Sequence, residues 1–127
     1  MDEISLTLPA DEAFRGVAHL VLSGLAVRLD LSYETLEDLE LALDALLERF
    51  EGAEEIELRV QVLEGELRTL VGPFSSMRAE LEATDDGSLG LSRILEAVTD
   101  RVEITERDGS EWVELTTRVD TVKAGRE

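Results

Sequence analysis

The sequence predicts an α/β fold, a two-layer sandwich in which a mixed, mostly antiparallel sheet of about five strands carries helices on one face. Two observations predict it. Apolar and polar residues alternate in five short segments, and apolar residues recur at three- and four-residue steps in the segments between them. The 127 residues, 43% of them hydrophobic, suffice for one core. We therefore expect a single domain over residues 1–120 and a loose tail over residues 121–127.

The amino-terminal half predicts one strand followed by two helices. Alternation over residues 4–8 predicts a strand that ends at Pro9. From Asp11 onward, apolar residues line one face of a helix, namely Phe14, Val17, Ala18, Val21, Leu22, Leu25 and Leu29. Ser32 can cap the second helix, because its hydroxyl can accept a hydrogen bond from a free amide of the first turn. The buried stripe of that helix comprises Leu36, Leu39, Leu43, Leu46, Leu47 and Phe50.

The carboxy-terminal half predicts two hairpins with two helices between them. Residues 56–62 and 67–71 alternate on either side of Glu64-Gly65, which indicates a hairpin. Gly72-Pro73 is expected to stop its second strand, since proline has no amide to donate. A short helix over residues 75–82, a polar turn over 85–88 and a helix over 91–98 follow. The last hairpin turns at Asp108-Gly109 and pairs Val102 and Ile104 with Val113, Leu115 and Val119.

Composition excludes several classes of function. The chain has 30 acidic and 12 basic residues, and a net charge of -18 repels nucleic acids and anionic membranes. There is no cysteine, which excludes disulfides and thiolate metal sites. No apolar stretch is long enough to span a bilayer and no signal sequence is evident, so we expect a cytoplasmic protein. An acidic surface could steer a basic partner, although solvation alone explains most of these charges.

Three stretches together resemble a known family. They are residues 20–26, residues 33–43, and residues 88–95 followed by 99–104. In order and spacing they are similar to the bacterial anti-sigma factor serine kinases, which belong to the histidine-kinase-like (GHKL) ATPases with the Bergerat fold. The resemblance implies binding of ATP and magnesium, phosphorylation of a serine on an anti-anti-sigma (STAS-like) partner, and inhibition of a sigma factor. It also implies a homodimer formed through the amino-terminal strand and first helix.

At the positions where this family carries its catalytic groups, the chain has other residues. Aligning Glu37-Asp38-Leu39 puts Ala45 at the position of the catalytic glutamate and Arg49 at that of the magnesium-binding asparagine. A methyl group cannot take a proton, and a guanidinium cannot ligate magnesium but could bind an anion. Leu70, before Gly72, stands where the family carries an adenine-recognising aspartate.

The glycine-bearing third box of the family is retained. Gly87 and Gly90 precede the helix that starts near Leu91, and such a turn could cradle phosphate, although turn geometry alone also explains both glycines. We therefore interpret the chain as an anti-sigma-type pseudo-kinase that binds a sigma factor or an anti-anti-sigma protein without Mg-ATP, with no catalytic residue and no cofactor expected. Two alternatives stay open. One is a serine kinase in which Arg49 contacts phosphate, and the other is a non-catalytic dimeric interaction module.

Other candidate sites carry less specific signals. Arg15, His19 and Arg28 beside the apolar stripe of the first helix form a candidate partner surface, and Leu20 and Val27 are extra apolar positions there. Acidic residues line one face of the second helix, which indicates a solvated face rather than a metal site. These are Glu37, Glu40, Asp44 and Glu48. The only histidine lacks a nucleophile motif, and Trp112 is expected to cover core more than to anchor a partner.

Overall fold

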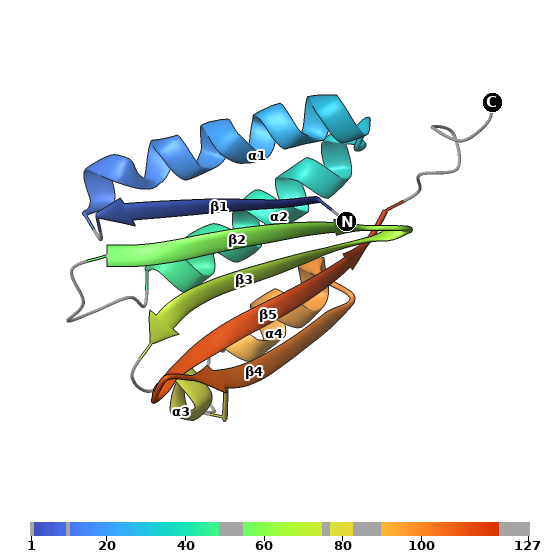
Figure 1. Cartoon of the computed structure of the whole chain (residues 1–127). Helices are drawn as coiled ribbons and strands as arrows, with labels where there is room; N and C mark the ends of the chain where they lie inside the picture. The colour runs from blue at the N-terminus through green and yellow to red at the C-terminus, as the bar shows by residue number, and fades with distance from the viewer. Residues whose placement is uncertain (1, 10, 49–54, 75–76, 83–89, 120–127) are drawn as a thin grey trace.

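The computed structural model describes residues 2–9, 11–48, 55–74, 77–82 and 90–119. It shows a five-stranded sheet with helices packed on one face, as the sequence predicts (Figure 1). The elements in chain order are β1 (Asp2–Pro9), a 3-10 turn η1 (Glu12–Phe14), α1 (Arg15–Leu29), α2 (Tyr33–Leu47), β2 (Glu55–Leu63), β3 (Glu66–Phe74), α3 (Met77–Glu82), α4 (Leu91–Val98), β4 (Arg101–Arg107) and β5 (Ser110–Arg118).

The sheet has the order β1-β2-β3-β5-β4, and every pairing in it is antiparallel. The mixed sheet expected from the sequence is thus a purely antiparallel one. Both predicted hairpins are present, and their turns contain residues with positive φ: Gly65 at 81° in the first, and Asp108 at 53° and Gly109 at 79° in the second. The second hairpin pairs Val102 with Leu115 and Ile104 with Val113, as predicted.

The end of α1 and the start of α2 each have an identifiable cap. Asp30 follows α1 in the left-handed conformation, with φ 58° and ψ 42°, and its amide donates to the last turn of the helix. Ser32 then caps α2, because its hydroxyl accepts a hydrogen bond of 3.0 Å from the amide of Thr35. Within the described residues α2 ends at Leu47, so the expected position of Phe50 in its stripe lies outside them.

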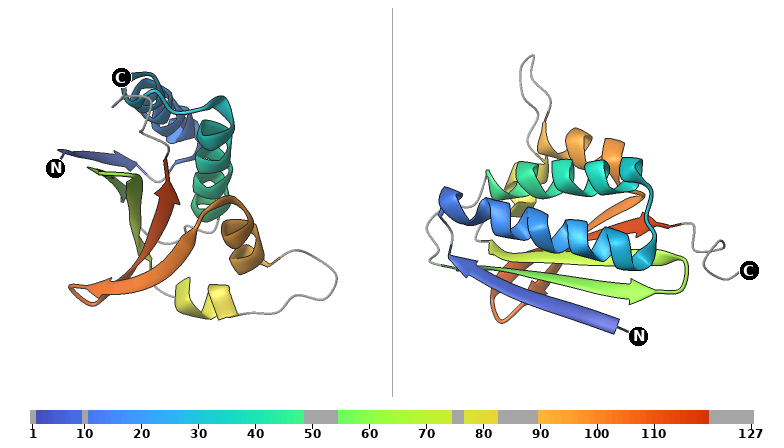
Figure 2. Two further views of the ribbon diagram at one scale, coloured as in Figure 1. Left: turned by 90° about the vertical axis from the view of Figure 1, so that its right-hand side faces the viewer. Right: turned by 90° about the horizontal axis from the view of Figure 1, so that it is seen from above.

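The core lies between the helices and one face of the sheet. Alternation within each strand sends every second side chain into it, and Figure 2 shows the helices lying against the inner face of the curved sheet. Many of the most completely enclosed residues come from α2, β2, β3, α4 and β5. Among them are Leu46, Val60, Leu67, Val71, Leu95, Val113 and Leu115.

Two sequence predictions are wrong in detail. β3 continues beyond Pro73 to Phe74, because the register with β5 shifts between Val71 and Phe74 and the ladder needs no amide from proline in such a bulge. Phe14 and Val17 were expected on the buried face of the first helix, but they are 40% and 36% exposed. In the sheet, β5 lies between β3 and β4, so Trp112 belongs to an interior strand.

Candidate functional site: the nucleotide-site positions and the helix layer

Ala45 occupies the fourth turn of α2 and belongs to the core. It is 7% exposed and lies in the same apolar cluster as Leu46 of α2 and Leu67 of β3. The helix places it there because Leu39, Leu43 and Leu46, at spacings of three and four residues, face the sheet. The side chain is a methyl group, which can neither accept a proton nor orient a hydroxyl. At this position the described structure therefore offers apolar surface only.

Leu70 and Gly72 lie on the other face of the sheet. Leu70 pairs with Arg59 of β2 and Glu114 of β5, and residues that are directly paired point to the same side of a sheet. That side is opposite to Leu67 and Val71, which enter the core. Although Leu70 is only 2% exposed, it does not belong to the core cluster that contains Ala45. The structure thus does not bring Ala45 and Leu70 together.

Gly72 makes room for the indole ring of Trp112. A Cβ atom added at Gly72 would lie 2.6 Å from Cδ2 of Trp112 and 2.9 Å from both Cγ and Cε3. Trp112 itself is 8% exposed, and the guanidinium of Arg59 lies over its ring at 5.9 Å from the centroid. This glycine therefore has a packing role on the outer face of the sheet. Trp112 is covered as expected, but it lies on that outer face instead of in the core cluster that the sequence predicts for it.

The remaining nucleotide-site positions are only partly described. Arg49 and Gly87 lie outside the described residues. Gly90 is the N-cap residue of α4, with φ -71° and ψ 159°, and its carbonyl accepts hydrogen bonds from the amides of Arg93 and Ile94 at 3.1 and 3.2 Å. That backbone conformation is accessible to any residue, so it does not require a glycine. As a glycine, the N-cap residue has no side chain with which to cap the first turn of α4.

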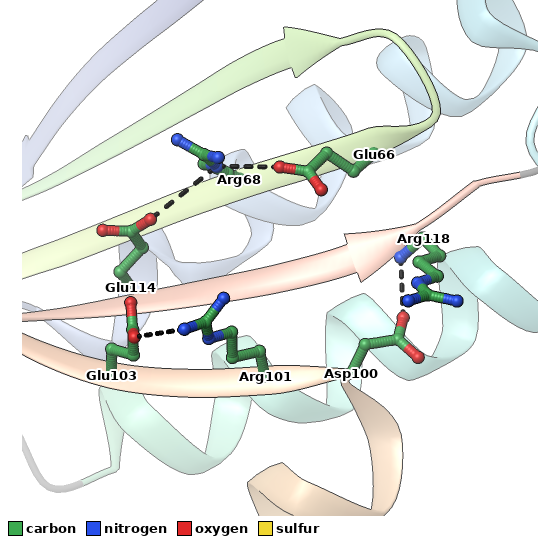
Figure 3. A network of polar contacts seen from close by, with 7 residues as sticks. All are labelled: Glu66, Arg68, Asp100, Arg101, Glu103, Glu114 and Arg118. Atoms are coloured by element: carbon green, nitrogen blue, oxygen red, sulfur yellow. Dashed lines mark hydrogen bonds and ion pairs between the residues drawn. The ribbon is translucent and has the colours of Figure 1, made fainter.

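Arginine and glutamate alternate across the outer face of the sheet (Figure 3). Arg68 pairs with Glu66 at 2.8 Å and approaches Glu114 at 3.9 Å, and Arg101 pairs with Glu103 at 3.1 Å. A hydrogen bond with Glu57 at 2.6 Å raises the pKa of the Arg59 guanidinium above its usual value. These exposed pairs hold the polar side chains close to the sheet, but each contributes little to stability.

His19 connects α1 to α2 through two carboxylates. Its Nε2 atom lies 2.8 Å from Oδ1 of Asp44, and its Nδ1 atom lies 3.4 Å from Oε2 of Glu40. The two carboxylates face different ring nitrogens, so these three groups do not converge on one point. Two members of the predicted acidic face are thereby engaged by His19. Among the described residues, no group of three histidine, aspartate or glutamate side chains is placed to hold a metal ion.

The other two members of the predicted partner surface differ in accessibility. Arg15 is half-buried, and its guanidinium donates a hydrogen bond of 3.5 Å to the carbonyl of Leu47 near the end of α2. Arg28, in the last turn of α1, is exposed. The sequence missed Tyr33 and Leu41 of α2, which are 74% and 52% exposed. The helical spacing of Leu41, two residues from both Leu39 and Leu43 of the buried stripe, was the available signal.

None of the described helices is both long enough and apolar enough to cross a membrane. No protein-family model matches the chain. Among curated proteins, it is similar to the serine-protein kinase RsbW of Bacillus velezensis, with 26% identity over 132 residues, 86% of this chain and 81% of the relative. RsbW of Bacillus pumilus is 26% identical over 134 residues, covering 86% of this chain and 82% of the relative. RsbW of Listeria monocytogenes is 37% identical over 67 residues, 49% of this chain and 43% of the relative.

A solved structure has the same fold. It is the crystal structure of the RsbU and RsbW domains of Rv1364c from Mycobacterium tuberculosis, with a TM-score of 0.68 and 18% identity. The match covers 94% of this chain and 33% of that one, so this chain spans about a third of its length. The similarity to the Bacillus proteins over most of the sequence confirms the resemblance noted above. Over most of its length the chain is therefore similar to the RsbW serine-protein kinases.

Proposed function

We propose that this chain is an anti-sigma-type regulatory protein that binds a sigma factor or an anti-anti-sigma (STAS-like) protein without Mg-ATP. The observation that carries the proposal is Ala45, a buried methyl side chain at the position that the family resemblance assigns to the catalytic glutamate. The similarity to the RsbW serine-protein kinases supports the regulatory role. A cytoplasmic location fits both kinds of partner.

The chemistry of phosphoryl transfer explains why the residue at position 45 matters for kinase activity. Transfer to a serine needs a group that accepts or orients the hydroxyl proton, and a cation that neutralises charge on the phosphates. A methyl group at position 45 supplies neither function. At the position assigned to the magnesium ligand, the sequence has Arg49, whose permanent positive charge disfavours a nearby cation. Binding of a protein partner, by contrast, needs neither a proton acceptor nor a magnesium ligand.

A second candidate function is a serine kinase with an unusual nucleotide site. The names of the curated relatives favour it, since all those reported above are serine-protein kinases. In this candidate, Arg49 binds a phosphate group directly and another residue acts as the base. Incubation with radiolabelled ATP, magnesium and the partner distinguishes the two functions, because only the kinase transfers label to a partner serine.

A third candidate is a dimeric interaction module without a regulated partner, in which β1 and α1 pair with a second copy. The position of β1 at an edge of the sheet favours it, since an edge strand has unpaired backbone groups. Light scattering of the purified chain over a range of concentrations tests it. A dimer in the absence of any captured sigma factor or STAS-like protein would favour this candidate over the regulatory one.

The test of the proposal is a binding experiment with defined partners. The full chain, immobilised, is offered each purified sigma factor and each STAS-like domain encoded by the same genome, once with Mg-ATP and once with EDTA and no nucleotide. The proposal expects one partner to be retained equally in both conditions. Retention of none of them would contradict the regulatory role, and retention that requires Mg-ATP would favour the kinase.

A further inference from the structure

The exposed apolar side chains are concentrated in one part of the molecule. Among the described residues, every large apolar side chain that is exposed belongs to β1, η1, α1 or α2. The most exposed are Val27 at 81%, Tyr33 at 74%, Leu20 at 73% and Leu41 at 52%. At the described positions of the outer face of the sheet no large apolar side chain is exposed, and Trp112 and Leu70 are covered there. Figure 2 shows α1 and α2 side by side, so these residues belong to one helix layer.

The same helix layer, residues 11–48, has a net charge of -7, a large share of the -18 of the whole chain. Residues 11–48 contain nine acidic and two basic residues. On α2, Glu34, Glu37 and Leu41 follow one another at spacings of three and four, so two carboxylates precede an exposed leucine on the same side of the helix. The outer face of the sheet is nearly neutral by comparison, with five arginines and six glutamates at its outward-pointing positions. Apolar exposure and acidity therefore coincide on one surface.

Two exposed glycines on α1 have no structural reason within the monomer. Gly16 and Gly24 lie inside the helix, where glycine costs about 1 kcal/mol relative to alanine. Neither has a positive φ, and a Cβ added at either would meet nothing within 4 Å. Gly16 precedes Leu20 by one helical turn and Gly24 follows it by one. Missing side chains at these positions leave the helix backbone open to close approach by another element.

We propose that this surface, formed by Gly16, Leu20, Gly24 and Val27 of α1 with Glu34, Glu37 and Leu41 of α2, binds a basic amphipathic helix of the regulated partner protein. Apolar residues of that helix cover Leu20, Val27 and Leu41, and its lysines or arginines face the α2 carboxylates. A second copy of this chain fits less well, because it would bring the same acidic charge to the surface. The inference rests on the proposed function and names the chemistry of the partner.

The probe for this surface is a synthetic helical peptide with leucines on one face and lysines on the other. It is titrated into the full chain labelled with ¹⁵N, and amide chemical shifts are followed. The proposal expects shift changes confined to residues of α1 and α2, with affinity that falls as salt is added. Shift changes spread over the whole acidic chain, or confined to the α3 and β4 side, would overturn it. Changes on dilution of the chain without peptide would overturn it in favour of self-association.

Matched variants separate a specific surface from general charge attraction. Leu20→Ser with Val27→Ser removes two exposed apolar side chains and should weaken peptide binding at least roughly tenfold. Glu34→Gln with Glu37→Gln should also weaken it. Its control is the same change at the exposed Glu103 and Glu106 of β4, which alters net charge equally and should leave affinity within about twofold. Equal loss from both glutamate pairs would contradict the proposal.

Gly24→Ala supplies a readout that a stability defect cannot imitate. It should make the free chain more stable and the complex weaker, because the new methyl group obstructs the approach of the partner. If the affinity for the peptide is unchanged, the glycines do not belong to the binding surface, and the proposed close approach of the partner is wrong. Failure of the proposed function is distinguishable from failure here. If the full chain captures a sigma factor or STAS-like domain and the Leu20 and Val27 variant captures it equally, the regulatory role stands and this surface is wrong.

Discussion

Gly72→Ala tests the packing role of a glycine that the sequence assigned to a nucleotide site. The new Cβ would lie 2.6 Å from Cδ2 of Trp112, about 1 Å closer than ordinary van der Waals contact. The obstructing atoms belong to a rigid fused ring that is 8% exposed, so the ring cannot simply rotate a flexible end away. Overpacking of this kind costs about 1 to 3 kcal/mol. Alanine also lowers the conformational entropy of the unfolded chain, which stabilises the folded state by roughly 0.5 kcal/mol. We expect a net loss of about 2 kcal/mol.

Urea denaturation measures this loss directly. Trp112 is the only tryptophan in the chain, so its fluorescence reports on the perturbed site, and far-UV circular dichroism reports on the whole fold. A loss of about 2 kcal/mol corresponds to a decrease in Tm of roughly 8 °C for a domain of this size. Gly24→Ala is the matched control, since its Cβ meets nothing within 4 Å and should stabilise by up to about 1 kcal/mol.

A double-mutant cycle identifies the cause of the loss. In a Trp112→Leu background the ring is absent, so Gly72→Ala should cost less than about 0.5 kcal/mol, which gives a coupling energy near 2 kcal/mol. Circular dichroism follows these variants, because the fluorophore is gone. The reasoning is refuted if Gly72→Ala costs the same with and without Trp112, or if the single substitution is neutral.

Three further substitutions test other parts of the structure. Leu70→Asp should destabilise by at least about 3 kcal/mol in urea denaturation, because it removes buried apolar area and adds a carboxylate beside Glu114, whereas Leu70→Met should cost under about 1.5 kcal/mol. Ser32→Ala should cost about 1 kcal/mol of thermal stability through the lost cap of α2, and Ser32→Asp should restore most of it. Asp44→Ala should lower the free energy of unfolding by no more than about 1 kcal/mol, because the side chains of Asp44 and His19 are 40% and 32% exposed and so pair weakly. Added salt should reduce the difference in stability between the variant and the original chain.

Much of the fold follows from local patterns in the sequence. Alternation set the strands, three- and four-residue spacing set the helices, and Asp108-Gly109 set the register of the last hairpin. The predicted end of the strand at Pro73 is wrong because the missing amide matters only where the strand ladder needs a hydrogen-bond donor. The bulge between Val71 and Phe74 removes that need. The predicted burial of Phe14 and Val17 is wrong because the apolar face of the first helix is wider than the part of the helix that the sheet covers.

The candidate site was harder to predict, because it depends on which face of the sheet a residue occupies. Alignment put Ala45 and Leu70 in one nucleotide site, but strand alternation relative to Leu67 puts Leu70 on the outer face. An experiment that restores Leu70→Asp along with Ala45→Glu would therefore test two separate places. The exposed residues of α1 and α2 were partly visible in the sequence, as Leu20 and Val27 lay off the buried stripe.

Calorimetric titration of the full chain with Mg-ATP tests the central claim most directly. Because Arg49 stands at the position that the resemblance assigns to the magnesium ligand, and Leu70 at that of the adenine-recognising aspartate, the chain is expected to give no binding heat and no increase in Tm at millimolar nucleotide. Saturable binding would contradict the account, and at a nucleotide concentration 100 times the Kd it would stabilise the fold by about 2.7 kcal/mol.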